Sequence, residues 1–225
     1  MFKTKISKEE VNVLPVVIFE GKITLVDDLS KVNSAVEELR RSTVVGIDTE
    51  TKPSFTRGTH HKVSLVQIST LDHCFLFRLN FIDLPTALAD FLADQDILKI
   101  GLSLRDDLTG LNKRHSFKPA GFIDIQTIAR NYGIMELSLQ KIYAILFNKK
   151  ISKSQRLTNW ENPELSEQQQ RYAATDAWAS LQIYLQLITE KKLSKKAVDA
   201  MIQQSMREQQ ALNPRPVISE TQVTN

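Results

Sequence analysis

The sequence predicts an α/β fold built on a mixed β-sheet. The segments "KVSLVQIST" and "HCFLFRL", residues 62–70 and 73–79, are rich in β-branched and aromatic residues and flank a short turn, which predicts an antiparallel hairpin. Strand and helix patterns then alternate along residues 84–128, and helical crossovers join parallel strands. A hairpin combined with crossovers requires a sheet that contains both strand directions.

The remaining elements follow from hydrophobic periodicity. Residues 22–26, "KITLV", predict a strand, and a helix follows from about residue 28, where apolar side chains recur at helical spacing. The β-branched run "TVVGIDT", residues 43–49, predicts a strand buried on both faces. Next come a helix over 84–94, a strand over 97–102, a helix over 103–115 and a strand over 120–128. From residue 126 to about 206 the pattern is helical, apart from a polar link over 148–164.

One globular domain accounts for most of the chain, because 42% of the 225 residues are hydrophobic. We expect this domain to span residues 22–206. Residues 1–21 form an N-terminal extension, in which Pro15 favours an edge strand or an extended segment. Residues 207–225 hold two prolines and few apolar residues, and we expect them to be a flexible tail.

Composition narrows the class of protein. The formal net charge of +3 permits a polyanionic partner without requiring one. Cys74 is the single cysteine, which excludes an internal disulfide and a cysteine-based zinc site and predicts a reducing compartment. No window approaches the roughly 18 apolar residues of a membrane span. We therefore expect a cytoplasmic protein with no membrane partner.

Two acids stand where a buried strand should end. Asp48 and Glu50 directly follow the run Val44, Val45 and Ile47, and ligand sites of α/β sheets collect at the carboxyl ends of strands. An Asp-x-Glu pair also arises easily by chance. Two solvated loop carboxylates are the alternative.

The helix over 103–115 distinguishes two adjacent acids. Leu104, Leu108 and Leu111 define its core-facing stripe. At about 100° per residue, Asp107 lies roughly 70° from the centre of that stripe, whereas Asp106 points away from it. An unpaired carboxylate at the margin of a core is costly, so Asp107 is a candidate ligand, with a salt-bridged or capping aspartate as the alternative.

A third group of residues lies on the helix that should begin near residue 167. Ser166 and Gln169 form a capping box, which predicts the helix start. Tyr172 and Asp176 are then one turn apart on the same face. The alternative is a buried tyrosine hydrogen-bonded to an aspartate. If the four carboxylates converge, they require divalent cations, and hard oxygen ligands favour Mg²⁺ or Mn²⁺.

The order of these motifs resembles a known family. "GIDTE", "KIGLSLRDDLTGL" and "YAATDAWASLQIY" resemble the three motifs of the DEDD superfamily of 3′-5′ exonucleases, and the resemblance covers about residues 24–190. It is strongest to Werner-syndrome-type exonuclease domains, with ribonuclease D next. The tyrosine subclass (DEDDy) has its tyrosine four residues before the last aspartate, as Tyr172 is, whereas the histidine subclass has its base one residue earlier, where Arg171 stands here.

The resemblance implies a fold and a reaction. It implies a ribonuclease-H-like fold with a mixed five-stranded sheet, and catalysis by Asp48, Glu50, Asp107 and Asp176 as ligands of two Mg²⁺ or Mn²⁺ ions, with Tyr172 aiming the attacking water. The reaction is hydrolysis of terminal phosphodiesters to nucleoside 5′-monophosphates by a two-metal mechanism. The expected substrate is nucleic acid with a 3′ end, as a single strand or overhang, with DNA favoured. A ribonuclease-D-like exoribonuclease and a non-catalytic nucleic-acid-binding module are the alternatives.

Basic and aromatic residues near the motifs can bind the substrate. The polar link offers a cluster of cations, which either contact phosphates or form an ordinary solvated surface. Phe55 can stack on a terminal base or belong to the core, and Trp160 is expected to pack. The candidate substrate-binding residues are Phe55, Arg57, His61, Lys62, Lys153 and Arg156.

Overall fold

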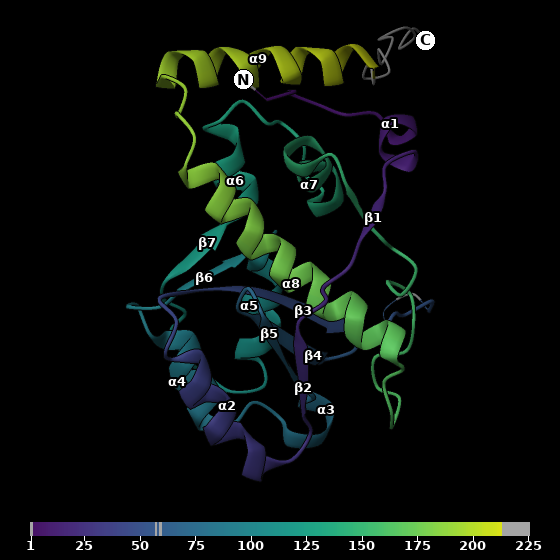
Figure 1. The fold of residues 1–225 in the computed structure, drawn as a ribbon, viewed down its shortest axis with the longest axis vertical. Coiled ribbons are helices and arrows are strands. Elements are labelled where there is room, and N and C mark those ends of the chain that lie inside the picture. Colours follow the sequence, from purple (N-terminus) through teal and green to yellow (C-terminus); the bar gives the residue numbers. More distant parts are fainter. Residues whose placement is uncertain (1, 57, 59, 213–225) are drawn as a thin grey trace, which may run out of the picture.

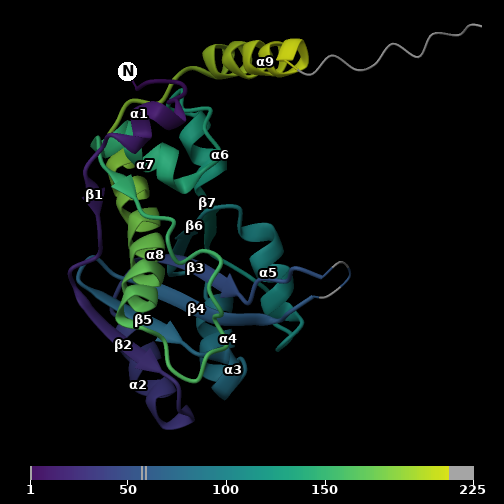
Figure 2. The same cartoon turned by 90° about the vertical axis from the view of Figure 1, so that its right-hand side faces the viewer.

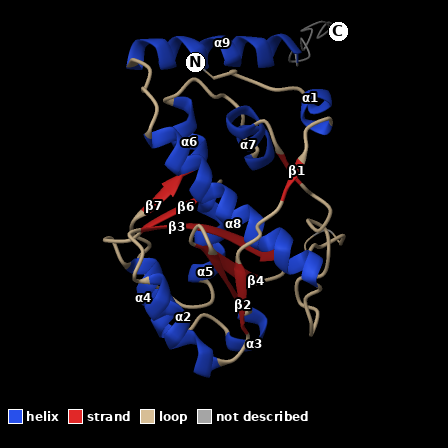
Figure 3. Ribbon diagram, viewed as in Figure 1, coloured by secondary structure: helices blue, strands red, loops and turns tan. Residues whose placement is uncertain are grey.

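The computed structural model of the chain describes residues 2–56, 58 and 60–212 (Figures 1 and 3). Its strands are β1 (Val16–Val17), β2 (Lys22–Val26), β3 (Val44–Thr51), β4 (Val63–Ser69), β5 (His73–Phe77), β6 (Leu98–Gly101), β7 (Phe122–Asp124) and β8 (Lys150–Ile151). Its helices are α1 (Lys8–Asn12), the 3₁₀ turn η1 (Leu29–Lys31), α2 (Val32–Leu39), α3 (Leu79–Ile82), α4 (Thr86–Ala93), α5 (Leu104–Asn112), α6 (Ile125–Arg130), α7 (Leu139–Phe147), α8 (Glu167–Ile188) and α9 (Lys195–Leu212).

The central sheet is mixed, as predicted. Its strand order is β2-β5-β4-β3-β6-β7. The predicted hairpin is present, since β4 pairs antiparallel with both β5 and β3, while β2–β5, β3–β6 and β6–β7 are parallel. The expected number of five strands is wrong for this chain. The sheet has six, because β2 extends one edge beside β5 and β7 extends the other beside β6.

Helices cover both faces of the sheet. The long helix α8 crosses one face and α5 lies on the other (Figures 1 and 2), where α2 and α4 pack in the same hydrophobic cluster as α5. Alternating residues of the strands point to the two layers: Leu65 of β4 belongs to the cluster beneath α8, whereas Val66 packs with α2, α4 and α5. This two-faced burial is why the strand sequences are apolar almost throughout.

Strand β7 is shorter than the sequence indicated. The apolar pattern over 120–128 was consistent with one strand, but β7 ends at Asp124 and α6 begins at Ile125. Oδ1 of Asp124 accepts a 2.8 Å hydrogen bond from the backbone N–H of Gln126, which is the geometry of a helix N-cap. The aspartate therefore ends the strand and starts the helix.

The terminal segments lie together at one end of the molecule. Strand β1 pairs parallel with β8, and the N–H of Met135 donates to the carbonyl of Thr4. Helix α9 lies beside the N-terminal segment (Figure 1) and includes residues 207–212, which belong to the expected tail, while residues 213–225 lie outside the described residues. Within residues 2–212, the described helices include none with the length and apolarity needed to cross a bilayer.

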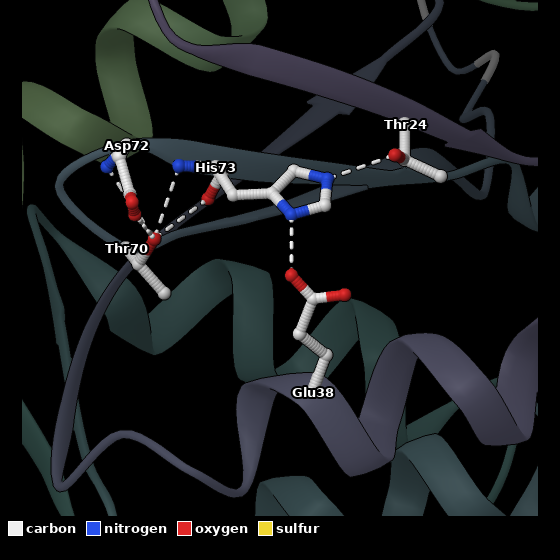
Figure 4. Close-up of polar contacts among 5 residues, drawn as sticks. All are labelled: Thr24, Glu38, Thr70, Asp72 and His73. Carbon is white, nitrogen blue, oxygen red and sulfur yellow. Dashed lines mark hydrogen bonds and ion pairs between the residues drawn. The ribbon is translucent and has the colours of Figure 1, made fainter.

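A polar cluster joins β5 to β2 and α2 at the far edge of the sheet (Figure 4). His73 contacts Glu38 through Nδ1 at 2.6 Å and Thr24 through Nε2 at 2.8 Å. The hydroxyl of Thr70 accepts a 3.0 Å hydrogen bond from the N–H of His73 and donates to the carboxylate of Asp72. These bonds hold the turn between β4 and β5, which fixes the register of the hairpin.

Candidate active site

Strand β3 presents two of the predicted acids to α8. Val45 and Ile47 pack with α2, α4 and α5, so the intervening residues point to the opposite face, where α8 lies. Gly46 makes the approach possible, because a Cβ atom there would lie 1.9 Å from the carbonyl oxygen of Ala177. The strand and the helix are therefore in backbone contact next to Asp48.

Helix α8 supplies a third acid and the tyrosine. The predicted capping box is present, with Ser166 and Gln169 each accepting a bond from the other's backbone, and the helix begins at Glu167. Asp176 is buried, and one carboxylate oxygen from each of Asp48, Glu50 and Asp176 lies within 4.8 Å of the other two. The side chain of Tyr172 lies beside Asp176 and lowers the pKa of its carboxyl. Three oxygen ligands so close together fit a divalent cation.

Asp107 stands beside this cluster and is held from another direction. The orientation of α5 is as predicted: Asp106 is exposed, Asp107 is half-buried, and Leu104 and Leu111 are buried. The hydroxyl of Thr49 donates a 2.6 Å hydrogen bond to Oδ1 of Asp107. The charge of Asp107 also raises the pKa values of Asp48 and Glu50, so it belongs to the same electrostatic unit.

The pKa values of the acids are raised, which shows that the ionised carboxylates are unfavourable in this site. Burial raises the pKa of Glu50 to about 9, assisted by the charges of Asp176 and Asp107. Burial raises the pKa of Asp176 to about 7, although Tyr172 and Lys153 oppose the shift. The pKa of Asp48 also lies well above its usual range, first through burial and then through neighbouring carboxylates. A bound cation removes this repulsion, which is why the donor set suits a metal.

Tyr172 remains a phenol at neutral pH. Burial raises its pKa, and the carboxylates of Asp176 and Glu50 raise it further, because a phenolate there would add negative charge to an acidic site. The hydroxyl is therefore a hydrogen-bond donor and acceptor beside the acids. It is not a base that has lost its proton.

A cavity of about 230 Å³ opens over the acids. Its lining includes Asp48, Tyr172 and Asp176 together with Lys153 and Arg156 of the polar link. Lys153 lowers the pKa of Asp176 and Arg156 lowers that of Glu50, so both cations lie near the carboxylates. Two other basic residues of the link face elsewhere: Lys150 donates to the carbonyl of Asn12, and Lys149 lines a groove on the other side.

The other predicted substrate-binding residues have diverse surroundings. Phe55 is 85% exposed, which rules out the core alternative, while Trp160 is fully buried as expected. Lys62 is exposed. His61 contacts Glu161 at 3.8 Å, and Lys52 contacts the same carboxylate at 3.3 Å, which links the segment after β3 to the polar link. Arg57 lies outside the described residues.

Sequence reasoning did not identify two neighbours of the acids. Gln67, fully buried on β4, is the register partner of Asp48 and donates to its Oδ2 at 3.5 Å. Thr49 supports Asp107. The signal for Gln67 was a polar residue within an otherwise apolar strand. The motif places Thr49 between the two acids, but only the position of α5 reveals its partner.

The comparisons with known proteins agree with this geometry. A family model described as 3′-5′ exonuclease matches residues 23–192. The chain belongs to the 3′-5′ exonuclease family. The resemblance to the DEDD superfamily is confirmed, and the cluster of Asp48, Glu50 and Asp176 fits a metal site.

The matches to individual relatives include most of this chain but a smaller share of each relative's own length. The chain is 29% identical over 184 residues to the bifunctional 3′-5′ exonuclease/ATP-dependent helicase WRN of Mus musculus, covering 77% of this chain and 13% of that protein. It is 33% identical over 165 residues to ribonuclease D of Haemophilus influenzae, covering 69% of this chain and 38% of that protein. The chain thus spans about half or less of the curated relatives it matches.

A solved exonuclease domain has the same fold. The Nibbler EXO domain of Aedes aegypti superposes with a TM-score of 0.69 at 24% identity, covering 83% of this chain and 98% of that one. The expected ribonuclease-H-like fold is confirmed, with helices on both sides of a mixed sheet.

Proposed function

We propose that the protein hydrolyses the terminal phosphodiester at the 3′ end of nucleic acid, releases nucleoside 5′-monophosphates, and belongs to the tyrosine subclass of its superfamily. The observation that carries the proposal is the three-carboxylate cluster of Asp48, Glu50 and Asp176, with Tyr172 lining the same cavity as Asp48 and Asp176. Without a bound cation, such a cluster would destabilise the fold, because the buried carboxylates repel one another.

The metal-binding residues follow from the donor set. Asp48, Glu50 and Asp176 hold the cations, with Asp107 as the fourth acid beside them. Because the donors are carboxylate oxygens, we propose Mg²⁺ or Mn²⁺, two ions in all. When bound, such ions stabilise charge on the reacting phosphate and lower the pKa of water.

The remaining site residues act on the substrate and the water. Tyr172 keeps its proton and holds the attacking water by a hydrogen bond, which selects one direction of attack. Lys153 and Arg156 line the cavity and can contact the phosphates next to the scissile bond. The exposed Phe55 is available to stack on a base of the strand.

We favour DNA with a single-stranded 3′ end or overhang as the substrate. This preference rests on the resemblance of the three sequence motifs to Werner-syndrome-type exonuclease domains, and the chain is 29% identical over 184 residues to the WRN protein. RNA is the second candidate, because the similarity to ribonuclease D is of comparable extent. A solved ribonuclease D of Trypanosoma brucei in complex with RNA U12 has a TM-score of 0.69 to this chain, which supports the same fold for the RNA alternative.

A time course with end-labelled substrates tests the proposal. Matched DNA and RNA overhangs, labelled at the 3′ or 5′ end, are incubated with Mn²⁺, Mg²⁺ or EDTA. Stepwise shortening from the 3′ end that EDTA stops supports an exonuclease, and the ratio of DNA to RNA rates decides between the two substrates. Asp48→Asn is the matched inactive control, because it keeps the size of the side chain.

The non-catalytic alternative predicts a different result. A protein that binds the overhangs and also binds Mn²⁺ by calorimetry, but shortens neither strand, is a nucleic-acid-binding module. That outcome contradicts the proposal directly.

A further inference from the structure

One carboxylate outside the acidic cluster joins two helices. Oδ1 of Asp124 accepts a 2.8 Å hydrogen bond from the N–H of Gln126 and so caps its own helix, α6. Oδ2 of the same residue accepts a 3.1 Å hydrogen bond from the N–H of Leu104, the first residue of α5. Asp124 and Gly101 are register partners in β7 and β6, so the side chain reaches across the turn that leads into α5.

Helix α5 needs this external acceptor. Its N-cap residue, Ser103, has a left-handed backbone with φ of 59° and, among the described residues, makes no side-chain capping bond. A non-glycine residue in that conformation persists only where the surroundings hold it. The first N–H groups of a helix have no partner within the helix. Asp124 supplies the missing acceptor to Leu104 and thereby fixes the direction in which α5 starts.

The same turn of α5 carries Asp107. Asp107 is three residues after Leu104, within the first turn of a rigid helix. On β3, the hydroxyl of Thr49 donates a 2.6 Å hydrogen bond to Oδ1 of Asp107. A loosened helix start would have to break or lengthen that bond, because the two contacts fix the same turn from opposite sides.

We propose that Asp124 is a positioning residue for the exonuclease site. By accepting from Leu104, it holds the start of α5 so that Asp107 stays beside the other three acids. This inference rests on the proposed function, since it assigns Asp107 to that metal site. The two carboxylate oxygens of Asp124 accept from the backbone N–H groups of Gln126 and Leu104.

Substitutions can separate the two bonds of Asp124. In Asp124→Ser the short hydroxyl still caps α6, as serine does at helix N-caps, but does not reach Leu104. The matched control is Asp28→Ser, because Asp28 is also an N-cap aspartate and its Oδ1 accepts from Ser30 at 2.7 Å, yet it lies at η1. Both changes remove one negative charge from the chain.

A charge-preserving substitution tests whether Asp124 acts only through its negative charge. Asp124→Glu keeps the negative charge but moves the carboxylate out of the position that both N–H groups need. If Asp124 acts through position, Asp124→Ser and Asp124→Glu are both defective. If it acts through charge alone, Asp124→Glu behaves as the wild type, and that result overturns the proposal.

The readouts are Mn²⁺ affinity by calorimetry, backbone hydrogen exchange of α5, and kcat and KM on a 3′ overhang. We expect both Asp124 variants to bind Mn²⁺ about tenfold more weakly, on the scale of other residues that orient metal ligands. The amides at the start of α5 exchange faster, and kcat falls while KM changes little. Asp28→Ser leaves all of these unchanged. Unaltered Mn²⁺ affinity and α5 exchange in both Asp124 variants overturn the inference.

These readouts separate the inference from the proposed function. Calorimetry and exchange do not require turnover, so a wild type without nuclease activity refutes the proposed function and still leaves the role of Asp124 measurable. Asp124→Asn is the second variant if Asp124→Ser does not fold. Its single acceptor oxygen can cap α6 but cannot serve Leu104 as well.

Discussion

Gly46 and Ala177 are in backbone contact: a Cβ atom on Gly46 would lie 1.9 Å from the carbonyl oxygen of Ala177. Asp48 follows Gly46 by two residues on β3, and Asp176 precedes Ala177 on α8. The distance between the two carboxylates is therefore set by how closely the strand and the helix approach each other. The site therefore requires a glycine at position 46, because a larger residue would keep α8 away from β3.

The first prediction is that Gly46→Ala damages both the fold and the site. The new methyl group clashes with backbone rather than with a movable side chain, so α8 has to shift. We expect a loss of about 3 kcal/mol or more in the free energy of unfolding, at the upper end for overpacking. Urea denaturation measures the loss, and Mn²⁺ calorimetry follows the site. Stability and Mn²⁺ affinity equal to those of the wild type would show that the helix can move freely.

The second prediction separates two adjacent acids. Asp107→Asn should lower kcat by about 100-fold or more, on the scale of removing one group that stabilises the transition state. Asp106→Asn should be nearly silent, because Asp106 is exposed. The two variants carry the same change one residue apart, so each controls the other. A silent Asp107→Asn with an inactive Asp106→Asn would show that the second motif has been read one residue out of register.

The third prediction concerns pH and metal. Without metal, Glu50 stays protonated in the folded protein up to about pH 9 although its ordinary value is 4.5, and Asp176 up to about pH 7 although its ordinary value is 3.8. Between these values the folded protein binds more protons than the unfolded chain, so the free energy of unfolding falls as pH rises. We expect urea denaturation in EDTA to show this decline from about pH 5 to about pH 9.

Two controls accompany the pH series. Asp176→Asn cannot ionise at this position, so it should flatten the lower part of the decline and make the metal-free protein more stable than the wild type near neutral pH. Added Mn²⁺ should restore stability in the wild type and much less in the variant, because a ligand that binds only the folded state stabilises it. Stability that rises with pH in EDTA would contradict the assigned pKa shifts.

Much of the architecture followed from local patterns. The hairpin of β4 and β5 and the alternation that follows it were visible as runs of strand and helix periodicity, and the apolar stripe of α5 sufficed to prefer Asp107 over Asp106 for burial. These features depend on residues close together in the chain. All six strands were visible in these patterns, and the number five came from the family resemblance. The strand order did not follow, because the parallel pairing of β2 with β5 joins segments that are not adjacent in the chain.

The supporting residues of the site were not predictable for the same reason. Thr49, Gln67 and Asp124 act on partners that are 58, 19 and 20 residues away. A threonine between two acids or an aspartate at the end of a strand has many ordinary explanations. The packing of α5 and β4 against β3 gives Thr49 and Gln67 their partners, and the pairing of β7 with β6 places Asp124 next to Leu104.

The fourth prediction tests the role of Tyr172. Tyr172→Phe removes the hydroxyl and keeps the ring, so packing changes little. We expect kcat to fall by about 10² to 10³, because the water loses its orienting bond while the metal ligands remain. Mn²⁺ affinity should stay within about threefold of the wild type, which a calorimetric titration checks. A fully active variant would remove Tyr172 from the mechanism.

The fifth prediction concerns the cations of the polar link. Lys153 and Arg156 line the cavity over the acids, whereas Lys149, in the same link, lines a groove with Trp178. Lys153→Gln and Arg156→Gln should raise KM by about tenfold, and each should reduce the slope of log affinity against log salt by about 0.7, the value for one phosphate contact with a single strand. Lys149→Gln removes an equal charge and should leave both quantities unchanged. Equal effects of all three substitutions would mean that the link attracts nucleic acid only through its total charge, because a direct phosphate contact depends on which side of the link the cation faces.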